Sequence, residues 1–329
     1  VTEYIRVLPE YDLLEKWIEV KNTGKKGSID IENVQSGTFF LPKNAYELTH
    51  LSGRWGYEYQ MNVTKLTQGL KTIQTKDLRS YGSSFFAIRP EGEQEETCGE
   101  VWFGSLQYSG NWRMDFEKYA PGEVQVTGGI NFWDQLLVLQ PGKSYTTPKL
   151  MVGYTNRGME GVSQNLASFT REKVLYPSHR DQVRPVLYNS WYATTFDVNE
   201  EHQLALAKIA KELGVEVFVI DDGWFKGRVN DKGGLGDWTV DKNKFPNGLQ
   251  PMIDKINAMG LDFGIWIEPE MVNPNSDLYR QHPDWVFHYP NRTRHETRNQ
   301  LMLNLAREDV YQYLYTCFST LLRENNIKF

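Results

Sequence analysis

The sequence predicts a multidomain β plus α/β protein, in which an antiparallel β-sandwich is followed by the first part of a parallel (β/α)8 barrel. Up to about residue 158, apolar and polar residues alternate in short runs with no long helical segment between them, as in antiparallel sheets. From about residue 185, apolar strands alternate with amphipathic helices, which indicates parallel β/α units. No glycine-rich phosphate loop follows these strands, which favours a barrel over a nucleotide-binding doubly wound sheet.

The first domain is expected to cover residues 1–158. Residues 14–21 alternate with period two and end at a turn-forming Asn-Thr-Gly, and residues 29–32 and 123–126 alternate in the same way. Residues 136–154 read as two strands joined by a Pro-Gly turn. These short strands with turn signals between them predict a sandwich.

Residues 159–184 are expected to connect the two domains. Apolar residues recur at helical spacing over 161–175, and Pro177 follows directly, so the sequence predicts a linker helix that ends before this proline.

The second domain is expected to cover residues 185–329. Asn199 is the predicted N-cap of its first helix, and glycines at 214 and 260 are predicted to end its first two helices. The expected parallel strands are 186–191, 215–220, 261–267, 301–305 and the start of a fifth at 327–329.

Composition excludes several classes of protein. The net charge is −6 with no basic stripe, which argues against a nucleic-acid partner, and no apolar run approaches the ~18 residues that span a bilayer. Cys98 and Cys317 lie far apart, so we expect no disulfide and a cytoplasmic location. With no Cys-x-x-Cys pair and no histidine directly after a strand, the sequence predicts neither a structural zinc site nor a catalytic metal.

Polar and aromatic residues gather at the predicted carboxyl ends of the barrel strands, where barrel enzymes carry their sites. Carboxylates accept hydrogen bonds from sugar hydroxyls, and an indole covers the apolar face of a sugar ring, so this set favours a sugar-binding site. The residues are Trp191, Asp221, Asp222, Trp266, Glu268 and Asn304.

The adjacent carboxylates Asp221 and Asp222 are the sharpest of these signals. Two ionised neighbours repel each other, so both need hydrogen-bond donors, which vicinal sugar hydroxyls supply. The alternative is that one of them only caps the turn. The catalytic carboxyls of a retaining glycosidase lie about 5 to 5.5 Å apart across the scissile bond, so we assign these neighbours to binding instead.

The assignments on the third strand and before the fourth stay open. Gly264, Trp266 and Glu268 share a face by strand alternation, and the glycine makes room for the indole, but core packing explains Trp266 equally well. Glu268 and Glu270 flank a proline, which suggests a rigid loop with surface carboxylates rather than catalytic groups.

Taken together, the motifs resemble glycoside hydrolase family 36, the bacterial α-galactosidases. The resemblance runs through essentially the whole chain in sequence order. The matching stretches are His50–Trp55 in the first domain and Asn189–Ala193, Phe218–Phe225, Leu235–Trp238, Phe263–Val272, His282–Trp285 and Arg298–Leu301 in the second.

The resemblance implies a fold and a set of binding residues. It implies that residues 1–158 are most of a β-supersandwich domain and that residues 185–329 open a TIM barrel. By similarity, Asp221 and Asp222 would bind the galactose 4- and 6-hydroxyls, Trp191 and Trp266 would wall the pocket, Arg298 would bind nearby, and Trp55 would reach over from the sandwich.

The resemblance also implies a retaining double displacement by two aspartates, without metal or cofactor, on α-galactoside oligosaccharides such as melibiose and raffinose. Members are often tetramers. In the family the nucleophile lies in a Lys-Trp-Asp stretch after the fifth strand, and the acid/base aspartate follows later. We therefore expect no catalytic residue within this chain, both lying beyond Phe329, and a truncated start.

Two departures from the family leave specificity open. Phe85 stands where many relatives carry histidine, and Tyr192 stands where they often have glutamate. An α-N-acetylgalactosaminidase of the same fold is one alternative, and a non-catalytic sugar-binding fragment is another.

Overall fold

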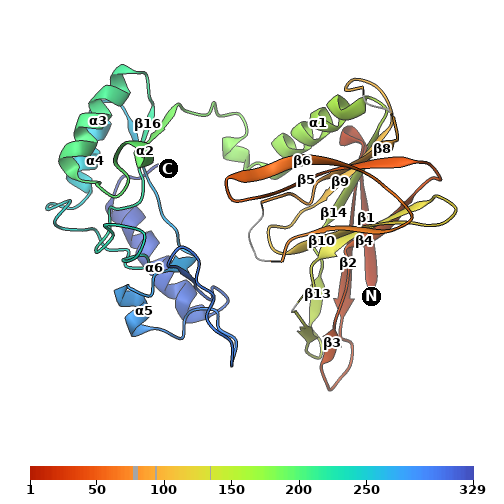
Figure 1. Cartoon of the computed structure of the whole chain (residues 1–329). Helices are drawn as coiled ribbons and strands as arrows, with labels where there is room; N and C mark the ends of the chain where they lie inside the picture. Colours follow the sequence, from red (N-terminus) through yellow and green to blue (C-terminus); the bar gives the residue numbers. More distant parts are fainter. Residues whose placement is uncertain (77–80, 93–94, 134) are drawn as a thin grey trace. The chain divides into compact units, whose positions relative to one another are not determined.

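An antiparallel β-sandwich forms the first of the two units into which the chain divides, Val1–Gln182 and Val183–Phe329. The computed structural model describes four stretches of the chain, 1–76, 81–92, 95–133 and 135–329. The strand pairings described in the first unit are antiparallel, which confirms the architecture that the alternating sequence predicts (Figure 1).

The sandwich consists of a larger and a smaller sheet, with a short two-stranded ribbon beside them. In spatial order, the larger sheet contains β1 (Thr2–Leu8), β2 (Leu13–Lys21), β14 (Leu150–Thr155), β9 (Val101–Leu106), β8 (Phe86–Pro90), β5 (Tyr46–Arg54) and β6 (Tyr57–Lys65), with β13 (Ser144–Thr146) also paired to β2. The smaller sheet contains β4 (Gly37–Leu41), β11 (Val124–Ile130), β10 (Trp112–Lys118) and β7 (Gly69–Gln74), and the ribbon is β12 (Leu137–Leu139) with β3 (Ile29–Ile31).

Side chains from both sheets interdigitate to form the core of the sandwich. Alternate residues of β10 are buried, and the ring of Phe116 lies edge-on to Phe86 of the larger sheet, with 5.3 Å between ring centroids. Phe39 of β4 stacks on the same Phe86 at 6.2 Å. This contact between facing strands is the reason that alternation with period two is visible in the sequence.

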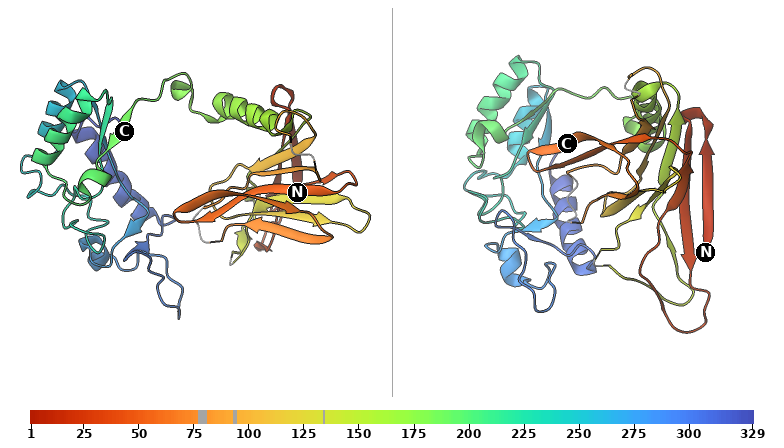
Figure 2. Two further views of the ribbon diagram at one scale, coloured as in Figure 1. Left: turned by 45° about the horizontal axis from the view of Figure 1, so that its top comes forward. Right: turned by 45° about the vertical axis from the view of Figure 1, so that its right-hand side comes forward.

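Helix α1 (Gly158–Phe169) covers the outer face of the larger sheet (Figure 2). Phe169 packs edge-on against Tyr11, which lies in the short helical turn η1 (Pro9–Tyr11) after β1. The helix continues as the π-helical segment η2 (Thr170–Val174), and η3 (Pro177–His179) follows. A helix is therefore present where the sequence predicts one, although it begins at Gly158, widens in its last turn and lies within the first unit.

Parallel β/α units form the first part of the second unit. Strands β15 (Leu187–Asn189), β16 (Val217–Ile220) and β17 (Asp262–Ile265) pair in parallel in that order. Helices α3 (Glu200–Glu212) and α4 (Gln250–Ala258) connect them and lie side by side in Figures 1 and 2. The remaining elements are α2 (Trp191–Thr194), β18 (Met271–Val272), α5 (Asp277–Gln281), β19 (Leu301–Met302) and α6 (Glu308–Glu324).

The expected fourth parallel strand at 301–305 is wrong. Residues Leu301–Met302 form β19, which pairs antiparallel with β18. The position beside β17 is taken by the end of the chain, where the Lys328 amide donates to the Phe263 carbonyl (2.8 Å) and the Ile265 amide donates to the Phe329 carbonyl (2.9 Å). The residues expected to begin a fifth strand therefore extend the hydrogen bonding of the sheet beside β17, and Asn304 does not follow a strand of the parallel sheet.

Gly264 makes room for a neighbouring strand rather than for an indole. A Cβ atom there would lie 2.9 Å from the Phe329 carbonyl oxygen and 2.9 Å from Cγ2 of Val219. Both distances are too short for a side chain. The small residue on β17 thus allows the end of the chain at Phe329 to approach β17 closely.

The Asn199 side chain caps helix α3 as the sequence predicts, because its Oδ1 accepts from the His202 amide at 3.0 Å. We expect Asn199→Ala to lower the free energy of unfolding by about 1 kcal/mol, since an amide of the first turn loses its acceptor. Asn199→Asp keeps the acceptor and should cost a few tenths of a kcal/mol at most. Urea unfolding of both variants tests this; equal losses would contradict the cap's role.

Among the described residues, no helix is both long enough and apolar enough to cross a membrane.

Candidate active site

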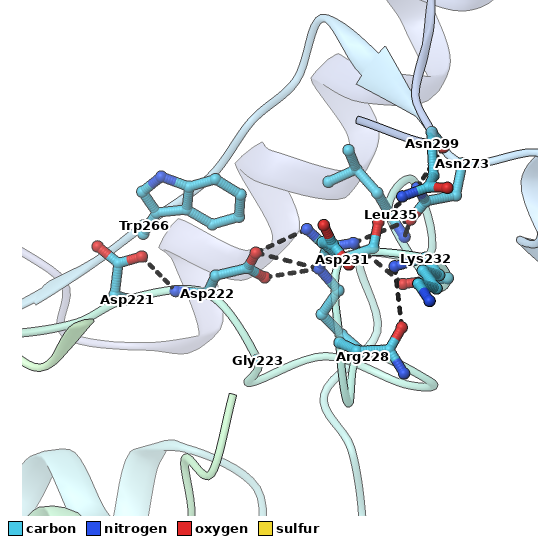
Figure 3. A network of polar contacts seen from close by, with 12 residues as sticks. Asp221, Asp222, Gly223, Arg228, Asp231, Lys232, Leu235, Trp266, Asn273 and Asn299 are labelled. Carbon is cyan, nitrogen blue, oxygen red and sulfur yellow. Dashed lines mark hydrogen bonds and ion pairs between the residues drawn. The ribbon is translucent and has the colours of Figure 1, made fainter. Parts of the chain in front are cut away.

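Two carboxylates and an indole lie together at the carboxyl edge of the parallel sheet (Figure 3). Asp221 and Asp222 directly follow β16, whose four residues are all buried, and Trp266 directly follows β17. Parallel strands bring their carboxyl ends to one edge, so residues 45 positions apart in the sequence meet there. The sequence therefore placed these three side chains on the correct edge.

Asp222 is held by a fully buried arginine from the following loop. Arg228 Nε lies 2.8 Å from Oδ1 and its Nη2 lies 2.7 Å from Oδ2 of Asp222, which itself is 4% exposed. The guanidinium carbon lies 5.3 Å from the Phe196 ring centroid and 5.9 Å from that of Phe225. The charge of Asp222 is thus balanced inside the protein. Its Oδ2 accepts from both Nε (3.1 Å) and Nη2 of Arg228, whereas Oδ1 accepts only from Nε and keeps a further acceptor direction.

Asp221 has a different environment, because it is only half-buried and its oxygens take neutral donors. Asn189 Nδ2 donates to Oδ2 at 2.7 Å, and the Asp222 amide donates to Oδ1 at 2.7 Å. The Asp221 amide donates to Oγ of Ser190 at 3.0 Å. The alternative that one carboxylate caps the turn thus applies in part to Asp221, but its charge has no partner cation among the described ion pairs.

Trp191 begins the short helix α2 instead of ending a strand. Its amide donates to Oδ1 of Asn189 (2.8 Å), the same side chain that holds Asp221. The indole packs edge-on against Phe196, with 5.2 Å between centroids. Asn189 therefore positions both Trp191 and Asp221, a role that the sequence reasoning did not assign to it.

Trp266 is half-buried and has aromatic support. Its ring centroid lies 6.4 Å from that of Trp238, and its carbonyl accepts from the buried Trp224 Nε1 at 2.9 Å. Core packing therefore explains part of the position of Trp266, while Figure 3 shows its indole beside the two aspartates.

Glu268 adds a carboxyl with a strongly shifted pKa. Burial raises the pKa of Glu268 to about 7, the negative charges of Glu270 and Asp222 act in the same direction, and Arg298 and Arg228 oppose them. Arg298 thus lies near enough to Glu268 to act on its charge, although its own side chain is exposed. A carboxyl that titrates near neutral pH is a candidate for proton transfer or hydrogen-bond donation.

Lys244 ties together the loops that follow β15 and β16. Its ammonium donates to the carbonyls of Phe196 (2.8 Å), Gly223 (2.6 Å) and Arg228 (3.1 Å). Burial lowers the pKa of Lys244, and Asp241, Asp197 and Asp222 oppose that change. The lysine fixes the backbone on either side of the aspartate pair.

Five of the six predicted binding residues lie in the second unit, and the sixth, Trp55, lies in the first. Trp55 lies in the turn between β5 and β6 and is 74% exposed. In the described part of the chain, no group of three or more His, Cys, Asp or Glu side chains could hold a metal ion.

Sequence reasoning missed Arg228, Lys244 and Asn273, which organise the site from loops. Their stretches are polar and rich in glycine or asparagine, so they read as exposed connections. One feature of the sequence could have pointed to Arg228. The repulsion between Asp221 and Asp222 requires nearby hydrogen-bond donors, and the next loop carries Arg228.

Comparison with known families identifies the chain. The family model "Melibiase" matches residues 144–329, more than half of the sequence. The chain belongs to the melibiase family. Its first part, residues 1–140, matches the model "Glycosyl hydrolase family 36 N-terminal domain", so the resemblance to family 36 is confirmed.

Relatives named as α-galactosidases match this melibiase-family chain over nearly its whole length. "Alpha-galactosidase AgaA" of Geobacillus stearothermophilus is 39% identical over 97% of the chain and 44% of its own length, and "Alpha-galactosidase Mel36A" of Lactobacillus acidophilus is 34% identical over 97% and 45%. The crystal structure of AgaA matches with a TM-score of 0.92, covering 96% of this chain and 44% of AgaA.

A Lactobacillus brevis α-galactosidase structure matches with a TM-score of 0.95 at 34% identity, covering 98% of this chain and 44% of its own. Variants of AgaA have been solved in complex with raffinose and with stachyose. The chain thus spans a little under half the length of these relatives.

Proposed function

We propose that the polypeptide carrying this chain is a retaining α-galactosidase that removes terminal α-D-galactosyl residues from oligosaccharides. The observation that carries this proposal is the pair Asp221 and Asp222 beside Trp266 at the carboxyl edge of the sheet, in a chain of the melibiase family. Carboxylates that accept from hydroxyls beside an indole suit a hexose. The raffinose and stachyose complexes of AgaA variants support oligosaccharides as the substrate class.

We propose further that the parallel sheet of the second unit is part of a closed (β/α)8 barrel. Among the described strands, β15 has a partner on one side only, and Lys328 and Phe329 pair only with β17. Open edges of a parallel sheet are buried in a closed barrel. The nucleophile and the acid/base aspartate would come from chain beyond Phe329, as the resemblance implies, since Asp221 and Asp222 are too close in sequence to flank a glycosidic bond.

Three further expectations belong to this proposal. The barrel works without a metal or cofactor, the assembly is a homotetramer as in many family members, and the protein is cytoplasmic. In support of the last, Cys98 and Cys317 lie in different units of the chain, which does not favour a disulfide framework.

The proposal is tested by turnover of a chromogenic α-galactoside and of the matching α-N-acetylgalactosaminide by the complete polypeptide. We expect preference for the galactoside, and we expect the 329-residue chain alone to be silent. Turnover by the short chain would contradict the placement of the catalytic residues, and no turnover by the complete polypeptide would favour a sugar-binding protein.

Asp221→Asn gives a sharper test of the binding assignment. Loss of a charged acceptor should weaken galactose binding about 10-fold, because a hydrogen bond to a charged group contributes about 1.5–3 kcal/mol. The matched control is Asp262→Asn, an exposed carboxylate at the opposite, amino end of β17. Galactose inhibition constants for both variants measure the effect; equal constants would remove Asp221 from the binding site.

A further inference from the structure

A turn in a rare backbone conformation carries Arg298. Both Arg298 and Asn299 have positive φ, 53° and 59°, although neither is glycine. Thr297 and Gln300 close the turn through two backbone hydrogen bonds of 3.1 and 3.0 Å. Left-handed residues other than glycine are disfavoured, and they persist where the surroundings hold them in place.

Asn273 is the residue that holds this turn. It follows β18, is 0% exposed, and its Nδ2 donates to the Asn299 carbonyl at 2.7 Å and to the Asp231 carbonyl at 3.2 Å. Its Oδ1 accepts from Nη1 of Arg228 and from the Leu235 amide, both at 2.9 Å. All four hydrogen-bonding directions of this amide are used, which fixes its orientation.

Arg228 extends this network of hydrogen bonds to Asp222. Its guanidinium presents Nε and Nη2 to the carboxylate and Nη1 to Asn273 and to the Gly233 carbonyl at 3.1 Å (Figure 3). Because the guanidinium is planar and rigid, a displacement at Asn273 displaces the edge that binds Asp222.

We propose that Asn273 is a positioning residue that couples Asp222 to the Arg298 turn. The coupling runs from Asp222 through Arg228 to Asn273 and from there to the Asn299 carbonyl. This network of hydrogen bonds sets the position of the Asp222 carboxylate relative to the turn that carries the Arg298 guanidinium. Its consequence for sugar binding rests on the proposed function, whereas the coupling itself does not.

The test uses Asn273→Asp in the complete polypeptide. This variant keeps an acceptor for Arg228 but replaces the donor to Asn299 with an oxygen. The matched control is Asn275→Asp, an exposed neighbour whose side chain accepts from Arg280. We expect amide hydrogen exchange at Thr297 and Gln300 to become at least about 10-fold faster in Asn273→Asp and to change less than about 2-fold in the control.

Galactose binding gives a second readout through a double-mutant cycle. Asn273→Asp should weaken galactose binding about 10-fold, but less than about 2-fold in a background that already carries Arg298→Ala, because the turn then has no guanidinium to position. The conservative variant Arg228→Lys should also speed amide exchange at Thr297 and Gln300, although Arg228 does not contact the turn. It replaces Asn273→Asp in the test if that variant does not fold.

The coupling would be overturned if the amides of Thr297 and Gln300 exchange as slowly in Asn273→Asp as in the unmodified polypeptide. The same holds for Arg228→Lys where that variant is used instead. Additive effects of Asn273→Asp and Arg298→Ala on binding would do the same. If the unmodified polypeptide does not bind galactose, the proposed function fails, while the exchange measurement still decides the coupling.

Discussion

Asp222→Ala is expected to lower the free energy of unfolding by about 3–5 kcal/mol, whereas Asp221→Ala should lower it by less than about 1 kcal/mol. The two neighbours differ because Asp222 neutralises Arg228, which is 0% exposed. Removing Asp222 leaves a buried guanidinium without a counter-charge. Asp221 is half-buried, and the amide of Asn189 that it releases can turn to water.

Urea unfolding of the two single variants measures this difference. A third variant, Asp222→Leu combined with Arg228→Met, removes both charges and should regain most of the lost stability, because an apolar pair of similar size avoids the desolvation cost. On the proposed function, the same double variant should still fail to bind galactose. Equal losses for the two single variants would show that the Asp222–Arg228 pair is not a buried charge pair in solution.

The position of the aspartate pair was predictable from the sequence, and its internal partner was not. A run of apolar residues that ends in Asp-Asp-Gly identifies a strand and the edge at which it ends. The burial of Arg228 depends on Asn273, on the Gly233 carbonyl and on two phenylalanine rings from other segments. Such long-range contacts leave no periodic pattern, so Arg228 reads as an ordinary loop cation.

The incorrect prediction of a parallel strand at 301–305 has a related cause. Leu301 and Leu303 alternate with partly exposed residues and are buried, as in a barrel strand. A short apolar run predicts a strand but not its partner or direction. Only the hydrogen bonds from Lys328 and Ile265 show that the place beside β17 is already filled. The sandwich was easier to predict, because each of its faces repeats the alternation over many strands.

Glu268→Gln is expected to change how stability depends on pH. The pKa of Glu268 is raised from 4.5 to about 7, mainly by burial and next by the charge of Glu270. Below about pH 4.5 the carboxyl is protonated in both the folded and the unfolded chain, so its contribution to stability is complete. Between about 4.5 and 7 only the unfolded chain loses the proton, so stability falls as the pH rises, and above about 7 the loss is complete.

The neutral amide of Glu268→Gln removes this loss. The free energy of unfolding of the variant should therefore equal that of the wild type near pH 4 and exceed it by about 2 kcal/mol at pH 8. This is less than the whole pKa shift would give, because the side chain keeps part of its contact with water. Glu270→Gln is the matched control: it removes a neighbouring negative charge, which should move the transition to lower pH without abolishing it. If the free energies of unfolding of wild type and Glu268→Gln change with pH in the same way across this range, Glu268 is ionised in the folded protein. That result would exclude it as a proton donor at neutral pH.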